Sequence, residues 1–333
     1  MTPEELHDAL QRFIARQVGE AVCVEGLRRL AGGASREIWS LDAVYGATRL
    51  ALVLRRDPGN TTMQTQRHEE FRVQQVAYAA GVPVARPYWL ATDVAELGAP
   101  AYLMGRVDGE TLARRLLRDD AYAAARRLMT AQLGAILARI HAIDPATPGL
   151  EALAAPPPGE SPALAELDRY EQIFRAIAPE PHAAFELAFR WLRQRLPDGA
   201  RRALVHGDYR IGNVVFGPEG VRAVLDWELA HVGDPAEDLG WLCVRAWRFG
   251  SDRLPVGGIG TREALFAAYE AAGGAPVDPA RVRFWEVFGN LKWAVICIAQ
   301  ARTHLDGLVH SVELASLGRR TAETEWELLE LIG

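Results

Sequence analysis

The first third of the chain combines two helical patterns with short apolar runs separated by turn residues. Residues 3–17 place Leu6, Leu10 and Phe13 on one face of a helix, and 27–54 contains two strand-like runs after a glycine turn, which predicts a hairpin. The other elements predicted here are a helix over 66–80 and strands over 84–91 and 100–107. This order indicates a small β-rich lobe.

From about residue 110 the apolar spacing becomes helical. A stripe at helical intervals predicts a helix with one buried face: Met129, Leu133, Ile136, Ile140 and Ile143. Helix is predicted again over 162–196, strands within 203–226, and helices from 236 to the end with breaks near 250–260 and 273–276. The pattern predicts an α+β fold with two lobes, 1–105 and 106–333, in agreement with a length of 333 residues.

Composition places the chain among ordinary globular proteins, with 49% hydrophobic and 24% charged residues. A net charge of -6 argues against nucleic acid as the main partner, since binding to phosphates needs a basic surface. No apolar run is long enough to cross a membrane, and residues 1–17 carry no apolar signal core, so we expect a cytoplasmic protein. Three widely spaced cysteines predict neither a disulfide framework nor a zinc site.

The segment 203–226 concentrates the candidate chemistry. Asp208 lies five residues before Asn213 in a loop between apolar strands, and Asp226 ends the strand that returns toward Asn213. Two carboxylates and an amide oxygen would then converge, and such oxygen ligands suit Mg²⁺ together with nucleotide phosphates. Each residue alone could be an ordinary turn or cap residue, and His206-Gly-Asp208 alone could belong to a metallohydrolase. The latter has no second His/Asp cluster to support it.

The motif His206-Gly-Asp-x-x-x-x-Asn213 followed by Asp226 resembles the aminoglycoside phosphotransferase and choline-kinase-like family. It is most similar to the branch that includes the phosphotransferase domain of some acyl-CoA dehydrogenases, over roughly residues 25–245. The resemblance implies a bilobal protein-kinase-like fold and transfer of phosphate from ATP, with Mg²⁺, to a hydroxyl of a small molecule. It also implies that Asp208 is the catalytic base and that Asn213 and Asp226 hold the metal.

Two further residues near this motif have counterparts in the family. His206 resembles the histidine that packs beneath the catalytic loop, and we interpret it as structural. Asp238, in Gly233-Asp-Pro-Ala-Glu-Asp, resembles the aspartate that accepts hydrogen bonds from the backbone of that loop. We therefore expect Asp238 to support the loop and not to react.

In the first lobe the resemblance assigns phosphate contacts to the turn that contains Gly32, Gly33 and Ser35. A Gly-Gly turn by itself is more often a simple hairpin turn, but small residues also let backbone N–H groups approach an anion. Met104 resembles the residue of the hinge between the lobes where adenine would bind, and an ordinary core role for it is equally compatible with the sequence.

The chain departs from the wider family where most kinases have a lysine. Arg55 stands at that strand position, and Glu70, or its neighbour Glu69, matches the helix glutamate that pairs with the strand cation. Arginine can grip phosphates through two nitrogens, although its head group is bulkier than an ammonium. The departure leaves a catalytically weak nucleotide-binding pseudokinase as the alternative to an active kinase.

The sequence restricts the phosphate acceptor only loosely. The branch favours a hydroxy acid or a hydroxyacyl thioester, and four cations could receive its anionic group: Arg245, Arg248, Lys292 and Arg302. An aminoglycoside would instead need acidic residues, and the segment 313–330 carries five glutamates. A solvated helix face explains those glutamates equally well.

Overall fold

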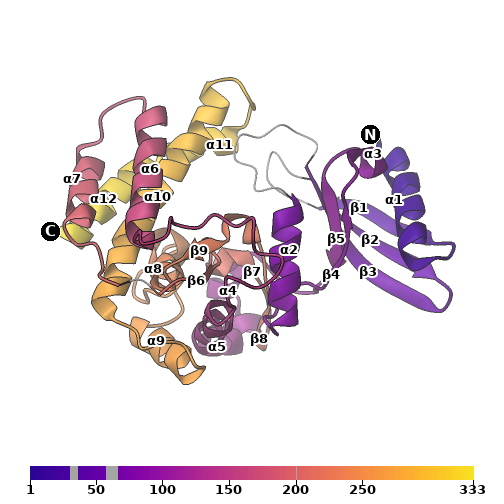
Figure 1. Ribbon diagram of the computed structural model, residues 1–333, viewed down its shortest axis with the longest axis horizontal. Helices are drawn as coiled ribbons and strands as arrows, with labels where there is room; N and C mark the ends of the chain where they lie inside the picture. The colour runs from indigo at the N-terminus through magenta and orange to yellow at the C-terminus, as the bar shows by residue number, and fades with distance from the viewer. Residues whose placement is uncertain (31–36, 58–66, 200) are drawn as a thin grey trace.

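The computed structural model describes residues 1–30, 37–57, 67–199 and 201–333. The first lobe is built on a five-stranded antiparallel sheet whose strands lie in the order β1-β2-β3-β5-β4. The bounds of the strands are β1 Cys23–Leu30, β2 Glu37–Tyr45, β3 Thr48–Arg56, β4 Pro87–Ala91 and β5 Ala101–Gly105. A helical lobe follows, so the predicted bilobal α+β fold is confirmed (Figure 1).

Helix α1 (Pro3–Val18) covers the face of the sheet that points away from the helical lobe (Figure 1). Thr2 caps its first turn, and the side chain of Glu5 completes a capping box. The predicted face, Leu6, Leu10 and Phe13, is buried against the sheet in one apolar cluster. This cluster gives the first lobe a core of its own.

Helix α2 (Arg67–Ala79) lies between the sheet and the helical lobe (Figure 1). Its residues Val73 and Ala77 belong to the apolar core of the helical lobe. Just beyond the helix, the amide of Val224 donates a 2.7 Å hydrogen bond to the carbonyl of Pro83. The lobes are thus joined by packing and a backbone bond as well as by the chain itself.

The helical lobe is organised around two long helices, α5 (Ala123–His141) and α10 (Pro279–Leu305). The predicted stripe on α5 is buried. The predicted helix over 162–196 is wrong as a single element: α6 ends at Ile177 and α7 begins at Ala183, because Pro179 and Pro181 interrupt the ladder of helix hydrogen bonds. The other α-helices of the described residues are α3 Val94–Leu97, α4 Ala113–Arg118, α8 Ala236–Cys243, α9 Arg262–Ala271, α11 Val312–Leu317 and α12 Arg320–Ile332.

Two short strand pairs lie at the centre of the molecule, next to α8 and α5 (Figure 1). They are β6 (Ala203–Val205) with β9 (His231–Gly233), and β7 (Val214–Gly217) with β8 (Gly220–Val224). The segment between β6 and β7 contains Asp208 and Asn213, and the segment after β8 begins near Asp226. The two strand pairs therefore bring Asp208, Asn213 and Asp226 to one region of the molecule.

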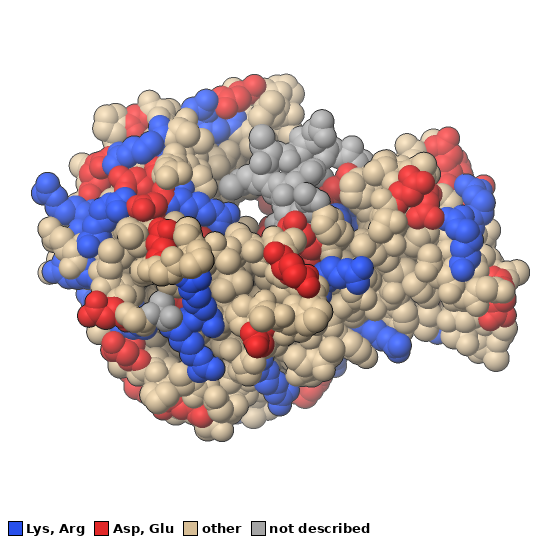
Figure 2. Space-filling view, viewed as in Figure 1, with Lys and Arg blue, Asp and Glu red and all other residues tan. Residues whose placement is uncertain are grey.

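The surface carries charges of both signs. On the face in Figure 2, arginine and acidic side chains are interspersed over the helical lobe and do not form one large patch of a single sign. Among the described residues, no helix is both long enough and apolar enough to span a lipid bilayer.

Candidate active site

The loop between β6 and β7 is fixed from below by one buried carboxylate. Asp238, on α8, accepts hydrogen bonds from the backbone amides of His206 (2.8 Å) and Gly207 (2.9 Å) and from the ring of His141 (3.1 Å). Burial alone would raise the pKa of Asp238, but the hydrogen bond and charge of His141 hold it below its ordinary value. The hydrogen bonds predicted for Asp238 are present, and the residue is fully buried, so it supports the loop from within the core.

Gly207 has a conformation that only glycine adopts easily. Its φ is 77°, and a Cβ at this position would overlap the carbonyl oxygen of Leu229. The neighbouring His206 is fully buried, which lowers the pKa of its ring, so the ring is neutral. Its Nε2–H donates to the carbonyl of Leu225 (2.9 Å) and its Nδ1 accepts from the amide of Asp208 (3.2 Å), in agreement with a structural role.

The carboxylate of Asp208 is held by three side-chain donors. Its Oδ1 accepts from the indole Nε1–H of Trp241 (2.8 Å) and from Nε of Arg210 (3.0 Å), and its Oδ2 accepts from Nδ2 of Asn213 (2.5 Å). The side chain is 15% exposed. Because charge-assisted hydrogen bonds are directional, the three donors hold this partly exposed carboxylate in one orientation.

Asn213 and Asp226 are brought together by the backbone. The amide of Leu225 donates to the carbonyl of Asn213 (2.8 Å), which places Asp226 one residue from that bond. Both hydrogen bonds from Nδ2 of Asn213 go to Asp208, and its Oδ1 accepts none among the described residues. Asp226 itself has a φ of 60°, in the left-handed region that costs a non-glycine residue about 1 kcal/mol. Such strain is often retained at functional sites.

Arg55 connects the sheet to Asp226. Its guanidinium forms ion pairs with Glu70 (2.8 Å) and with Asp226 (2.9 Å), and only 4% of the residue is exposed. Glu70 also pairs with Arg67, so one buried carboxylate serves two arginines. Burial opposes the charge on Arg55, but Glu70 and Asp226 raise its pKa above the ordinary value, and the cation is permanent. Glu70, and not Glu69, is therefore the partner of the strand cation.

Of the remaining predicted residues, the structure describes only Met104. Gly32, Gly33 and Ser35 lie outside the described residues. Met104 is buried on β5 at the start of the connection to the helical lobe, in a small cluster with Val53. This position is compatible with both interpretations of Met104, as a hinge residue and as a core residue.

The sequence did not predict that several other residues would support Asp208 or its loop. Trp241 and Arg210, which orient Asp208, and Lys292, which lies behind the loop, are examples. Glu166, His231 and Glu237 place one possible ligand atom each within 4.8 Å of one another. Since Glu237 already binds both the ring of His231 (3.1 Å) and Nζ of Lys292 (3.0 Å), we interpret this group as a buried charge network and not as a metal site.

The charge network predicts a pH-dependent stability. Burial alone would lower the pKa of His231, but Glu237 and Glu166 raise it to about 9. Between pH 6.5 and 9 the folded protein therefore holds a proton that the unfolded chain has lost, and the free energy of unfolding should fall by roughly 1–3 kcal/mol as the pH rises through this range. Urea unfolding at a series of pH values measures this slope.

Two variants control for other titrating groups. In His231→Gln the fall in the free energy of unfolding between pH 6.5 and 9 should be much smaller, whereas His310→Gln, which changes an exposed histidine, should retain it. A slope that is the same in wild type and His231→Gln would show that this histidine is not the responsible group.

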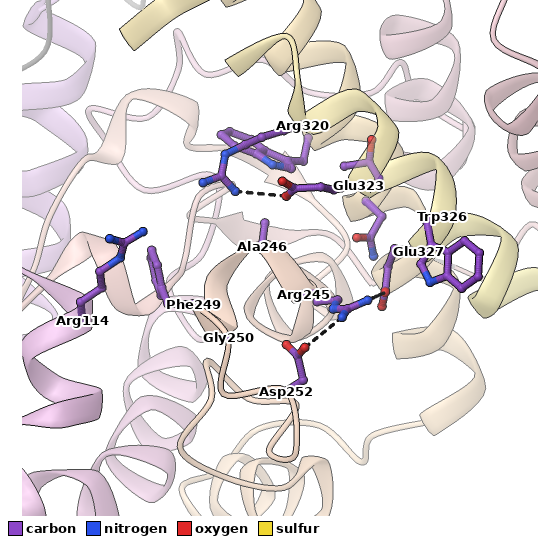
Figure 3. Close-up of a pocket in the computed structure, with 13 residues that line it drawn as sticks. Arg114, Arg245, Ala246, Phe249, Gly250, Asp252, Arg320, Glu323, Trp326 and Glu327 are labelled. Atoms are coloured by element: carbon purple, nitrogen blue, oxygen red, sulfur yellow. Dashed lines mark hydrogen bonds and ion pairs between the residues drawn. The ribbon is translucent and has the colours of Figure 1, made fainter. Parts of the chain in front are cut away.

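A cavity of about 510 Å³ is lined by residues of α4, α10, α12 and the segment that follows α8. Figure 3 shows Arg114 of α4 on one side, Arg320 and Glu323 of α12 on the other, and Arg245 at the base. Trp293 lines it as well and contacts the ring of Trp247 (4.8 Å between centroids). Trp247 packs in turn against Trp241 (5.1 Å), so a chain of ring contacts runs from the lining of the cavity to the indole that donates to Asp208.

A five-stranded antiparallel lobe joined to a helical lobe, with Asp208, Asn213 and Asp226 gathered in one region, defines the class of the protein as a kinase-like phosphotransferase fold. The chain belongs to the phosphotransferase enzyme family, whose model matches residues 26–285. The predicted family and the predicted enzyme class are thereby confirmed.

Individual relatives agree with this assignment. Acyl-CoA dehydrogenase family member 10 of Mus musculus is 30% identical over 295 residues, which are 83% of this chain and 27% of that protein. The chain thus spans about a quarter of the length of that relative. The crystal structure of a protein from Ralstonia eutropha JMP134, described as an aminoglycoside phosphotransferase, is 26% identical with a TM-score of 0.77 and covers 97% of this chain and 98% of its own.

A third comparison concerns the fold alone. A thermostable mutant of the aminoglycoside phosphotransferase APH(4)-Ia, solved with ADP and hygromycin B, is 18% identical with a TM-score of 0.64, over 97% of this chain and 98% of that one.

Proposed function

We propose that this protein transfers the γ-phosphoryl group of ATP, with Mg²⁺, to a hydroxyl group of a small molecule. The observation that carries the proposal is the placement of Asp208. Three donors fix its carboxylate, and one of them is Asn213, whose carbonyl accepts a hydrogen bond from the amide of the residue before Asp226. Asp226 in turn pairs with Arg55. Phosphoryl transfer is catalysed mainly by positioning and by charge, which is what such a group of residues provides.

On the nucleotide side, the available donors suit a magnesium ion. Asp226 contributes a carboxylate with 38% of its side chain exposed, and Asn213 contributes an amide oxygen that accepts no hydrogen bond among the described residues. When bound, Mg²⁺ would neutralise the charge that develops on the phosphates. The proposal also assigns phosphate contacts to Arg55 and to the turn with Gly32, Gly33 and Ser35, and adenine contact to Met104. The ADP in the 18% identical structure supports a nucleotide in this fold.

On the acceptor side, Asp208 takes the proton of the attacking hydroxyl group. Trp241 and Arg210 both donate to Oδ1, whereas Oδ2 accepts from one side-chain donor, Asn213, so we expect the acceptor to approach Oδ2. The Trp293–Trp247–Trp241 contacts connect the lining of the cavity with the ring that donates to Oδ1 of the same carboxylate. We therefore assign the acceptor to the cavity of Figure 3.

The acceptor that the cavity suits best is an anionic hydroxy compound. Arg114 lines the cavity and forms no ion pair within the described part of the chain. Of the four cations that the sequence analysis named as candidates, Arg245 lines the cavity but pairs with Asp252 and Glu327. The other three are engaged elsewhere: Arg248, Lys292 and Arg302. Together with the acyl-CoA dehydrogenase relatives, Arg114 favours a hydroxy acid or a hydroxyacyl thioester over a polycationic aminoglycoside.

Two further expectations belong to the proposal. We place the boundary between the nucleotide-binding lobe (1–105) and the catalytic lobe (106–333) where β5 ends at Gly105. A cytoplasmic location is supported by the three free cysteines, two of them buried, because reduced thiols are typical of that compartment. The pseudokinase alternative is less favoured, because the base-like residue and both metal-type ligands are retained.

The proposal is tested in two steps. Calorimetric titration of ATP with and without Mg²⁺ should show metal-dependent binding. ADP formation is then followed over a library in which hydroxy acids and their CoA thioesters are matched with neutral polyols and aminoglycosides. Turnover with the anionic acceptors supports the whole proposal, turnover with aminoglycosides alone contradicts the acceptor class, and binding without turnover on any acceptor would favour the pseudokinase.

Arg55 gives a prediction for the nucleotide side. Arg55→Ala should raise the KM for ATP and lower kcat together, about tenfold in kcat/KM or more, because a buried charge-assisted contact to the phosphates and to Glu70 is lost. Arg55→Lys should be partly active, since the charge stays and the fork geometry does not. Steady-state kinetics with varied ATP measures both effects.

Arg49→Ala is the matched control, because Arg49 lies on the same strand and its ion pairs are exposed. Its kinetics should equal those of wild type. If Arg55→Ala also behaves like wild type, Arg55 has a purely structural role.

A further inference from the structure

The only lysine of the chain lies behind the catalytic loop. Lys292 is on α10, and 2% of it is exposed. Its Nζ donates to the carbonyl oxygen of Gly207 (3.0 Å), the residue directly before Asp208, and to Oε1 of Glu237 (3.0 Å). Gly207 is thus held at its carbonyl by a buried cation and at its amide by Asp238.

The same ammonium also supports the ring that orients Asp208. Its Nζ lies 4.9 Å from the centroid of Trp241, within the range of a cation–π contact. The indole Nε1–H of Trp241 donates to Oδ1 of Asp208. Lys292 therefore contacts two separate supports of one carboxylate, the backbone before it and the indole beside it.

Lys292 acts as a fixed cation. Burial alone would lower its pKa, but Tyr170 and Glu237 raise it above the ordinary value. Glu237 accepts from the ring of His231 as well, and its pKa is lowered to about 2, so the pair stays ionised over the working pH range. An ammonium that never loses its proton cannot exchange one with substrate.

We propose that Lys292 is a positioning residue, which sets the direction of the Asp208 carboxylate through Gly207 and Trp241; this inference rests on the proposed function of Asp208. A buried ion pair contributes little to stability when apolar groups of the same volume can replace it. What Lys292 adds is a fixed geometry, because its ammonium binds a carbonyl oxygen, a carboxylate and a ring face at the same time. A methionine of similar length can bind neither the carbonyl oxygen nor the carboxylate.

Lys292→Met tests the proposal with two readouts. Hydrogen exchange should be at least about tenfold faster in the peptide that covers 204–213, while peptides from β2 and β3 keep the wild-type rates. Hydrolysis of Mg-ATP by water should lose about ten- to a hundredfold in kcat with a nearly unchanged KM for ATP, the expected cost of a misplaced reacting group. Lys292→Arg, which keeps the charge, should recover part of kcat.

Two further variants separate positioning from stability. Arg281→Met removes a cation from the same helix that pairs with the buried Asp234, and it should leave kcat and the exchange of 204–213 unchanged. In an Asp208→Ala background Lys292→Met should change the residual rate less than twofold, because the group it positions is gone. If Lys292→Met fails to fold, the double variant Lys292→Met/Glu237→Gln removes both charges and takes its place.

Each outcome decides one question. Unchanged exchange in 204–213, or an equal loss of rate in the wild-type and Asp208→Ala backgrounds, would overturn the positioning role of Lys292. Absence of any ATP turnover by the wild type contradicts the proposed function, and the exchange of 204–213 then still decides whether Lys292 holds the loop.

Discussion

Asp208→Ala should lower the rate of phosphoryl transfer by about 10²–10⁴ while the affinity for Mg-ATP stays nearly unchanged. The carboxylate is held in a fixed direction by three donors, and its removal deletes the proposed proton acceptor without removing Asn213 Oδ1 or Asp226. Single-turnover kinetics and calorimetry on the same preparation measure the two quantities.

The choice of substitution matters at this position. In Asp208→Asn the new amide would oppose the Nδ2 donor of Asn213, and the side chain of Asn213 would then turn over. We therefore expect the asparagine variant to lose rate and also some affinity for Mg-ATP. Asp168→Ala, which removes an exposed partner of Arg193, is the control and should change neither quantity. An alanine variant at Asp208 with more than half of the wild-type turnover would exclude its role as the base.

Asp226→Ala should weaken magnesium-dependent binding of ATP more than Asp208→Ala does. Loss of an outer partner of a metal site costs about 10- to 100-fold, and loss of a direct ligand should cost at least as much. The variant also frees Arg55 from its 2.9 Å ion pair, so ATP binding without Mg²⁺ should be unchanged or slightly stronger. Titrations of ATP at several concentrations of Mg²⁺ separate the two effects.

Asn213→Ala provides the comparison for this prediction. It removes one amide oxygen but no charge, so its affinity for Mg-ATP should fall between those of Asp208→Ala and Asp226→Ala. Equal Mg²⁺ dependence in all three variants would contradict the assignment of Asn213 and Asp226 as the metal ligands.

Much of the fold could be predicted because the local patterns agree with the tertiary structure. The helix over 3–17 carries its cap and its apolar face within one short segment, and the stripe on α5 is equally local. The prediction of a single helix over 162–196 was wrong because the apolar periodicity continues on both sides of Pro179 and Pro181. These two prolines indicate the break between α6 and α7, but the continuous periodicity hides it. Strand β9 was missed because three buried residues are too few to show a period.

The residues of the site also fall into those that the sequence predicts and those that only the tertiary structure reveals. Asp208, Asn213 and Asp226 lie within one short stretch, so their spacing alone suggested that they meet. Trp241 and Lys292 reach Asp208 only through the packing of α8 and α10, and nothing in their neighbouring residues predicts it. Arg55 was identified by its strand position, but its contact with Asp226 joins residues 171 positions apart and appears only in three dimensions.

The burial of Lys292 has a practical consequence for chemical modification. Every other basic side chain of the protein is an arginine or a histidine, so amine-reactive dyes, biotin esters and lysine cross-linkers find no exposed side-chain amine on the folded molecule. Modification of Lys292 requires that α10 separate from the loop. The appearance of a labelled lysine over time therefore reports opening of the helical lobe, without any engineered probe.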